Sequence, residues 1–75
     1  MNTNTLTVYV RLLDEGTEVL RPVLAALISG NEYQLLEDQD YDQDDEEWEF
    51  PPGTRVICDY KTILDKISIV AQQRA

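Results

Sequence analysis

Apolar and polar or amphipathic residues alternate strictly in the stretch Leu6-Thr7-Val8-Tyr9-Val10-Arg11-Leu12. Successive side chains of a β-strand point to opposite faces, so the two leucines and two valines would share one face. β-Branched and aromatic residues also favour strands. The stretch therefore predicts a half-buried strand, and with it a sheet that is apolar on its inner side.

Later stretches carry the same signals. They predict strands around Trp48-Glu49-Phe50, over residues 54–60 and over residues 67–71. Within the second of these, three alternating residues are expected to face the core together: Val56, Cys58 and Tyr60.

Turn residues and polar residues mark the connections. Pro51-Pro52-Gly53 predicts a type II turn with Pro52 and Gly53 at its centre. We expect residues 61–66 to connect the last two strands and residues 72–75 to form a flexible tail.

One segment admits two interpretations. Leu24-Ala25-Ala26-Leu27-Ile28 is rich in strong helix formers, which would give an α+β domain with a short helix near residues 22–28. However, Ser29-Gly30-Asn31 follows directly, and a second run begins at Glu32, which is the pattern of a β-hairpin. We favour strands over about 19–28 and 32–36, with Pro22 on an edge or at a bulge.

Five or six short strands within 75 residues predict a single all-β domain covering residues 1–75. A small SH3-like barrel or roll fits this size and strand count best, and pattern alone does not separate it from an OB-like barrel. Closure into a barrel would also hide the sheet edges.

Acidic residues concentrate in one part of the chain. Nine of the thirteen residues from Glu37 to Glu49 are Asp or Glu, and they account for the whole net charge of −9. We call residues 37–49 the acidic segment, and we expect residues 37–47 to form a long loop. A local field of this sign favours basic protein surfaces or cations as partners and disfavours direct contact with nucleic acid or anionic membranes.

Cysteine and histidine usage narrows the chemistry. Cys58 is the only cysteine and there is no histidine, so neither an intramolecular disulfide nor a Cys/His zinc site can support the small core. No secretory signal pattern begins the chain, and we expect a cytoplasmic protein. A second copy or a partner could add stability, so a homo-oligomer is compatible with the sequence.

The stretch from Val8 to Val23 (VYVRLLDEGTEVLRPV) resembles a group of short, uncharacterised bacterial proteins. They share the leading strand, the Leu-Asp-Glu-Gly-Thr turn, the Arg-Pro-Val step and a later aromatic-x-Phe-x-Pro-Gly element, here Trp48 to Gly53. Members carry an aromatic residue where this chain has Leu20. The resemblance implies a small bacterial β domain and implies no activity.

The acidic segment supports three functional hypotheses. The first is a non-enzymatic binding module whose loop engages a basic protein surface, with Tyr41 as an exposed aromatic anchor. The partner-binding residues would be Glu37, Asp38, Asp40, Tyr41, Asp42, Asp44, Asp45, Glu46 and Glu47.

The second hypothesis is an inhibitor that mimics nucleic acid. If the segment is extended, alternate carboxylates from Asp38 to Glu46 would line one face at a spacing of about 6.6 Å. Such a row could occupy the phosphate-binding groove of a nuclease or a DNA- or RNA-binding protein.

The third hypothesis is a calcium-binding module. Six acidic residues fall at the ligand positions of an EF-hand loop, although Gln43 replaces its glycine and Asp45 its apolar residue. The ligands would be Asp38, Asp40, Asp42, Asp44, Glu46 and Glu49. Calcium is the one cofactor that the sequence suggests.

Catalysis has little support in the sequence. Without histidine there is no ordinary general base near neutral pH, and Cys58 alternates with apolar neighbours, as a buried, inert thiol would. We therefore expect no enzyme. Three arginines, Arg11, Arg21 and Arg55, could instead clamp the acidic segment within the same molecule.

Overall fold

The protein, analysed as a computed structural model, is described over residues 5–13, 16–37, 41–42, 44 and 46–75. These residues contain six strands and no helix: β1 (Thr5–Leu13), β2 (Leu20–Ser29), β3 (Glu32–Leu35), β4 (Glu47–Trp48), β5 (Arg55–Ile63) and β6 (Lys66–Arg74). The predicted all-β class is confirmed. The alternative helix near residues 22–28 is wrong, because β2 runs through them as a strand paired on both sides over part of its length.

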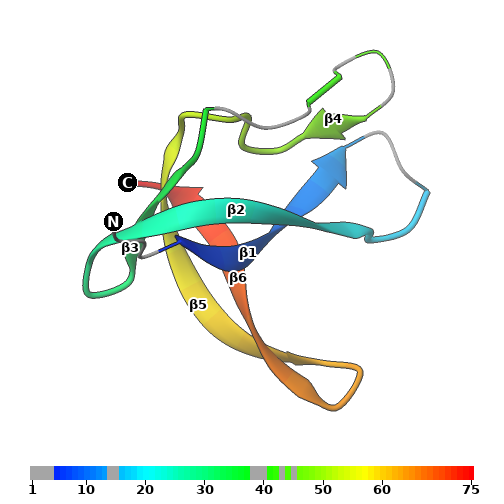
Figure 1. Ribbon diagram of the computed structural model, residues 1–75. Coiled ribbons are helices and arrows are strands. Elements are labelled where there is room, and N and C mark those ends of the chain that lie inside the picture. Colours follow the sequence, from blue (N-terminus) through cyan, green and yellow to red (C-terminus); the bar gives the residue numbers. More distant parts are fainter. Residues whose placement is uncertain (1–4, 14–15, 38–40, 43, 45) are drawn as a thin grey trace.

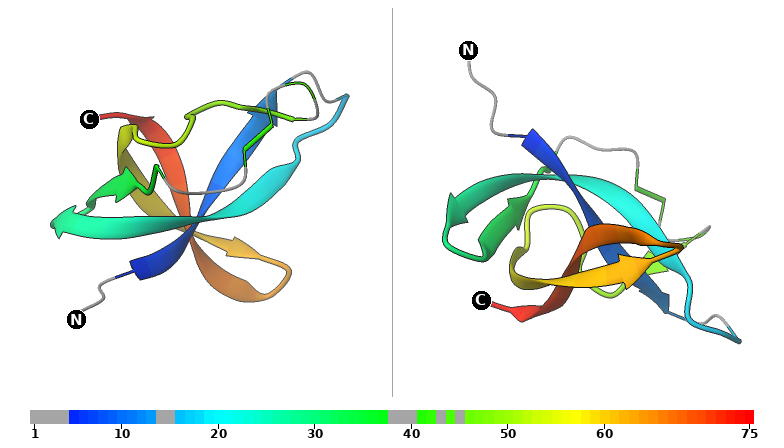
Figure 2. Two further views of the ribbon diagram at one scale, coloured as in Figure 1. Left: turned by 45° about the horizontal axis from the view of Figure 1, so that its top comes forward. Right: turned by 90° about the horizontal axis from the view of Figure 1, so that it is seen from below.

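Five of the six strands form a closed ring in the order β1, β2, β3, β5, β6 (Figures 1 and 2). Neighbours along this order are antiparallel, whereas β6 returns to β1 in parallel. Because the five strands alternate in direction, the first and the fifth run the same way. The ring can therefore close only through a parallel contact. A ring of this kind gives a small compact β fold, and its SH3-like form remains a prediction.

The core fills the ring. Val8, Val10 and Leu12 of β1 are buried, as the alternating pattern predicts, whereas Leu6, the first residue of the same alternation, is exposed. β4 pairs with the end of β1 and sets Trp48 opposite Leu12, so that this short strand lies across one end of the ring (Figure 1). Trp48 and Phe50 both pack into the core, although the strand predicted around residues 48–50 is limited to Glu47–Trp48.

Two glycines lie in turns with positive φ, which glycine adopts without a steric penalty. Gly30, with φ 53°, begins the two-residue turn of the predicted β2–β3 hairpin. Gly53, with φ 91°, is the third residue of a turn in which the Thr54 amide donates to the Pro51 carbonyl at 3.2 Å. The type II turn predicted at this position is confirmed.

Pro22 lies where β2 has one neighbour. It is opposite Tyr9 of β1, and the pairing with β3 begins only at Ala25. Because proline has no amide hydrogen to donate, a position with one open side suits it, as predicted.

The last two strands are longer than their sequence pattern indicates. The predicted connection over 61–66 is wrong: residues 61–63 continue β5, Lys66 begins β6, and only Leu64 and Asp65 form the turn. Both have positive φ, 50° and 66°. Such a turn normally carries Asn-Gly or Asp-Gly, so Leu-Asp gave no recognisable signal.

The expected tail also belongs to a strand. β6 extends to Arg74, where Val56 is its partner, and the Ala75 amide donates to the Arg55 carbonyl at 3.0 Å. The prediction of a strand that ends at residue 71 is therefore wrong, because backbone hydrogen bonds continue β6 after its apolar side chains end.

Tyr60 is the exception to the predicted inner face of β5. Val56 and Cys58 are buried, but 68% of Tyr60 is exposed. The β5–β6 hairpin projects beyond the ring, so its outer half has no core to face (Figure 1). Tyr60 nevertheless lies close to Tyr33, whose pKa is raised mainly by burial and further by Tyr60 and Cys58.

We predict that replacing the strained turn with a favourable one stabilises the protein. The double substitution Leu64→Asn/Asp65→Gly replaces a leucine that is poorly suited to positive φ and gives the turn the preferred Asn-Gly sequence. The free energy of unfolding should rise by about 1 kcal/mol, measured by chemical denaturation. A decrease would contradict the two-residue turn.

Candidate functional site

Two arginines tie the C-terminal end of the acidic segment to the ring. Arg11 of β1 forms an ion pair with Glu49 at 2.9 Å, and Arg21 of β2 forms one with Glu46 at 3.5 Å. The Glu49 amide also donates to the Arg11 carbonyl at 2.9 Å. The segment is therefore fixed at this end by backbone and side-chain contacts together.

Arg11 is shared between two carboxylates. Besides Glu49, it contacts Glu18 at 3.1 Å. The hydrogen bond to Glu18, with the charges of both carboxylates, raises the pKa of Arg11 above its usual range. Arg55, by contrast, pairs with Glu32 of β3, and it has no ion pair with the described residues of the acidic segment. The predicted intramolecular clamp is thus confirmed for Arg11 and Arg21, and within the described residues Arg55 takes no part in it.

Glu46 links the charged surface to the core. The indole Nε1–H of Trp48 donates to Glu46 Oε1 at 3.2 Å, the same oxygen that faces Arg21. The ring of Tyr41 packs on Trp48 with centroids 4.6 Å apart and an interplanar angle of 54°. The expectation that Tyr41 is exposed is wrong, because the Trp48 ring offers it an apolar surface and leaves it partly buried.

Four carboxylates of the segment remain without an ion-pair partner among the described residues. They are Glu37, Asp42, Asp44 and Glu47. The first three are exposed, and Glu47 is partly buried. Glu37 also covers Gly53, where an added Cβ would lie 3.1 Å from Glu37 Cγ.

The middle of the segment is turned and not extended. The Glu46 amide donates to the Asp42 carbonyl at 2.9 Å, and the Asp44 amide donates to Asp42 Oδ1 at 3.0 Å. Bonds across four residues fold the backbone back on itself. The evenly spaced row of carboxylates predicted for nucleic-acid mimicry is therefore wrong over Asp42 to Glu46.

The predicted calcium ligands are only partly within the described residues. Asp38 and Asp40 lie outside them, as does Asp45 of the partner-binding set. Glu46 and Glu49 already neutralise arginines. Across the described ranges, no three acidic or cysteine side chains gather in a group that could hold a metal ion.

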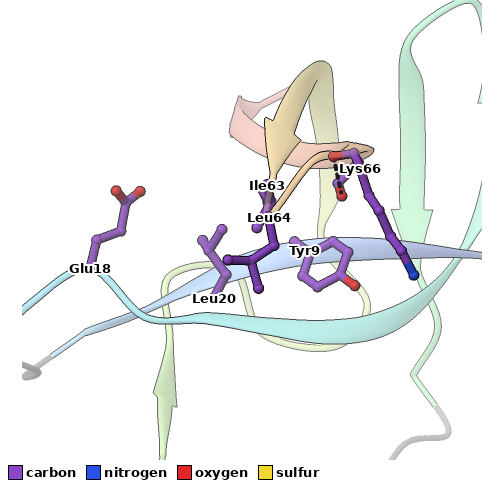
Figure 3. A pocket seen from close by; sticks show the side chains of 7 residues that line it. Tyr9, Glu18, Leu20, Ile63, Leu64 and Lys66 are labelled. Atoms are coloured by element: carbon purple, nitrogen blue, oxygen red, sulfur yellow. Dashed lines mark hydrogen bonds between the residues drawn. The ribbon is translucent and has the colours of Figure 1, made fainter.

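A groove that the sequence did not predict lies on the outer side of the ring. It has a volume of about 480 Å³ and is lined by Tyr9, Glu18, Leu20, Ile63, Leu64, Lys66 and Ser68. In Figure 3, the apolar side chains lie between Glu18 and Lys66. Because Glu18 already pairs with Arg11, Lys66 supplies the available charge. The groove depends on the β5–β6 hairpin passing beyond β1, which no sequence motif signals.

Cys58 is buried, as expected. Loss of solvation raises the pKa of its thiol from 9.0 to about 11. At neutral pH the thiol is therefore protonated, which makes it a poor nucleophile.

Comparisons with protein families, curated proteins and solved structures return no match to this chain. None of the described residues forms a helix long and apolar enough to cross a membrane. Function is therefore inferred from the geometry and charge of this chain alone.

We predict a measurable coupling between Arg11 and Glu49. A double-mutant cycle with Arg11→Met and Glu49→Gln should give a coupling free energy of about 1 kcal/mol at low salt, because the contact is short and partly buried. The Arg55–Glu32 pair is the matched control, longer and more exposed, and should give less than about 0.5 kcal/mol. Equal couplings would contradict the special position of Arg11.

The Cys58 thiol should be protected until the protein unfolds. Alkylation at about pH 8 should proceed only through the unfolded state, where the pKa is ordinary. Because folding raises this pKa, the thiol contributes a constant stability below pH 9.0, and this contribution decreases as the pH rises towards about 11. The free energy of unfolding relative to Cys58→Ala measures it. Rapid alkylation of the folded protein would contradict the burial.

Proposed function

We propose that this protein is a non-enzymatic, cytoplasmic binding module, built as an SH3-like barrel, whose acidic segment engages a basic surface of a partner protein. The observation that supports the proposal is that the segment has two kinds of carboxylate, those paired with arginines of the ring and those exposed to solvent. Glu46 and Glu49 are used internally, by Arg21 and Arg11. Exposed carboxylates at Glu37, Asp42 and Asp44 have no such partner among the described residues.

Anchoring favours binding because it lowers the entropy that a partner must remove. A free acidic chain loses its conformational freedom on binding, which weakens the complex. Here Glu46, Trp48 and Tyr41 hold the segment beside the ring before any partner arrives. The remaining charges are therefore presented from a partly fixed position.

Charge selects the class of partner. The segment carries the entire net charge of −9, so its field attracts cationic surfaces and repels nucleic acid. Lysine- and arginine-rich protein surfaces meet this requirement and would associate faster at low salt. Because the Asp42–Glu46 turn does not offer an evenly spaced row of charges, a protein surface is favoured over a nucleic-acid-binding groove.

The experiment compares two variants of equal net charge. The test variant is Asp42→Asn/Asp44→Asn/Glu47→Gln, which removes three charges that have no ion-pair partner in the described part of the chain. At position 42 the new side-chain amide keeps a carbonyl oxygen that can accept the backbone amide of residue 44, as the Asp42 carboxylate does. The control variant is Glu18→Gln/Glu32→Gln/Asp65→Asn, which removes three charges outside the segment. Both change the net charge from −9 to −6 by the same arithmetic, −9 + 3.

A pull-down from lysate of the native host gives the measurement. A basic protein should be retained by the wild type and the control and largely lost by the test variant, and added salt should release it. Equal retention by the wild type and the test variant would contradict the proposal. Competition by DNA or RNA for the same protein would instead favour the inhibitor hypothesis.

A further inference from the structure

The groove of about 480 Å³ lies where the β5–β6 hairpin passes β1 and the start of β2 (Figure 3). Tyr9 and Leu20 line it from the ring, and Ile63 and Leu64 line it from the hairpin. A concave and mainly apolar surface of this size, with a few polar groups at its margin, is the usual form of a small-molecule site. The groove therefore has the size and the lining of a ligand site.

Leu64 has an unfavourable environment on the hairpin side of this groove. Its exposed fraction is 92%, and its φ of 50° lies in the left-handed region, which is costly for a leucine. Backbone strain of this kind is concentrated at ligand-binding and other functional sites. A ligand that covered the Leu64 side chain would remove apolar surface from water. This residue therefore marks the place where an apolar ligand body would lie.

The groove has an available positive charge at one end. Lys66 forms no ion pair within the described part of the chain, whereas Glu18, at the other end, contacts Arg11 at 3.1 Å. Lys61 lies on the same side of the hairpin as Lys66, because it is opposite Ser68, which lines the groove. It also has no ion pair among these residues. The two lysines together attract an anion to this end of the groove.

The polar groups beside the groove suit a single carboxylate. The Lys66 ammonium is a compact charge with three N–H donors, and one negative charge balances it. The Ser68 hydroxyl contacts the Lys66 carbonyl at 3.5 Å, a long distance for such a bond, so it can turn and donate to a carboxylate as well. A dianion such as a phosphate ester would meet too little positive charge, since Asp65 adjoins Lys66 and the chain carries a net charge of −9.

We propose that the groove binds a small monocarboxylic acid with an aliphatic or aromatic body. The carboxylate contacts Lys66. The apolar body covers Leu64 and lies against Tyr9 and Leu20. The charges at the two ends of the groove fix this orientation, because Lys66 attracts the carboxylate and Glu18 repels it. The site needs neither the acidic segment nor a protein partner.

Titration with octanoate, followed by proton–nitrogen correlation NMR, tests the proposal. Octanoate combines one carboxylate with an aliphatic body, and it should cause saturable shifts of the backbone amides of Tyr9, Leu20, Leu64 and Lys66. Two matched compounds separate the charge from the body. Octylammonium has the same body with the opposite charge, and butanoate has the same charge with a shorter body. Each should bind at least about tenfold more weakly than octanoate.

Three variants locate the site. Lys66→Met removes the charge and should weaken octanoate binding about tenfold. Leu64→Asn removes the apolar side chain and should weaken binding roughly fivefold or more. Because asparagine tolerates positive φ better than leucine, this variant should be no less stable than the wild type, so its loss of binding cannot come from unfolding. Arg74→Met removes the same charge as Lys66→Met from the exposed end of β6, outside the groove, and should bind octanoate as the wild type does.

Several results would overturn the proposal. They are the absence of saturable shifts at millimolar octanoate, an equal response to octylammonium, and unchanged affinity in Lys66→Met or in Leu64→Asn. Shifts centred on Tyr60 and Ile67 would also contradict it, since these exposed residues alternate with the groove residues along β5 and β6 and lie on the other face of the hairpin.

A second copy of the chain that covers the groove would be a further contradiction. Sedimentation equilibrium would then give a mass of twice 8.6 kDa, and octanoate would cause no shifts. The titration uses the isolated protein and reports on the groove alone. Its outcome is therefore independent of the pull-down that tests the acidic segment, and either proposal can fail without the other.

Discussion

The parallel contact between β1 and β6 is the constraint on which the rest of the structure depends. It consists of one registered pair, Tyr9 with Val70. The contact is parallel because five strands of alternating direction can close into a ring only in this way. Closure surrounds a small core without a disulfide or a Cys/His metal site, since Cys58 is the only cysteine and there is no histidine. Val8 and Ala71, on either side of the contact in sequence, are fully buried. Apolar packing therefore supports a junction that has little backbone pairing of its own.

Closure of the ring also determines where the acidic segment lies. With β1 enclosed between β2 and β6, its far end remains free to pair with β4. That pairing brings Trp48 into the core and Glu49 to Arg11, and it fixes the acidic segment beside the ring. The outer half of β5 extends beyond the ring and, among the described strands, is paired with β6 alone. One short closure thus accounts for the anchored acidic surface.

The sequence predicted what short-range patterns encode. Alternation identified β1, and the glycines at 30 and 53 identified two turns with positive φ. The sequence did not predict the turn at Leu64-Asp65, because this residue pair is atypical of turns with positive φ. It also did not predict the exposure of Tyr60, because periodicity does not tell how far a strand extends past the core. The sequence indicated that Arg11 and Arg21 could bind the acidic segment, but it did not identify the carboxylates that they contact. Their partners lie far along the chain, and only the ring topology brings them together.

Solution NMR tests the closed ring most directly. A closed ring should give nuclear Overhauser contacts between backbone protons of β1 and β6 around Tyr9 and Val70, together with those of the antiparallel pairs β1–β2 and β5–β6. Contacts within the antiparallel pairs but none between β1 and β6 would mean an open sheet. In that case β6 would not cover β1, and closure of the ring could explain neither the burial of Val70 nor the position of the acidic segment.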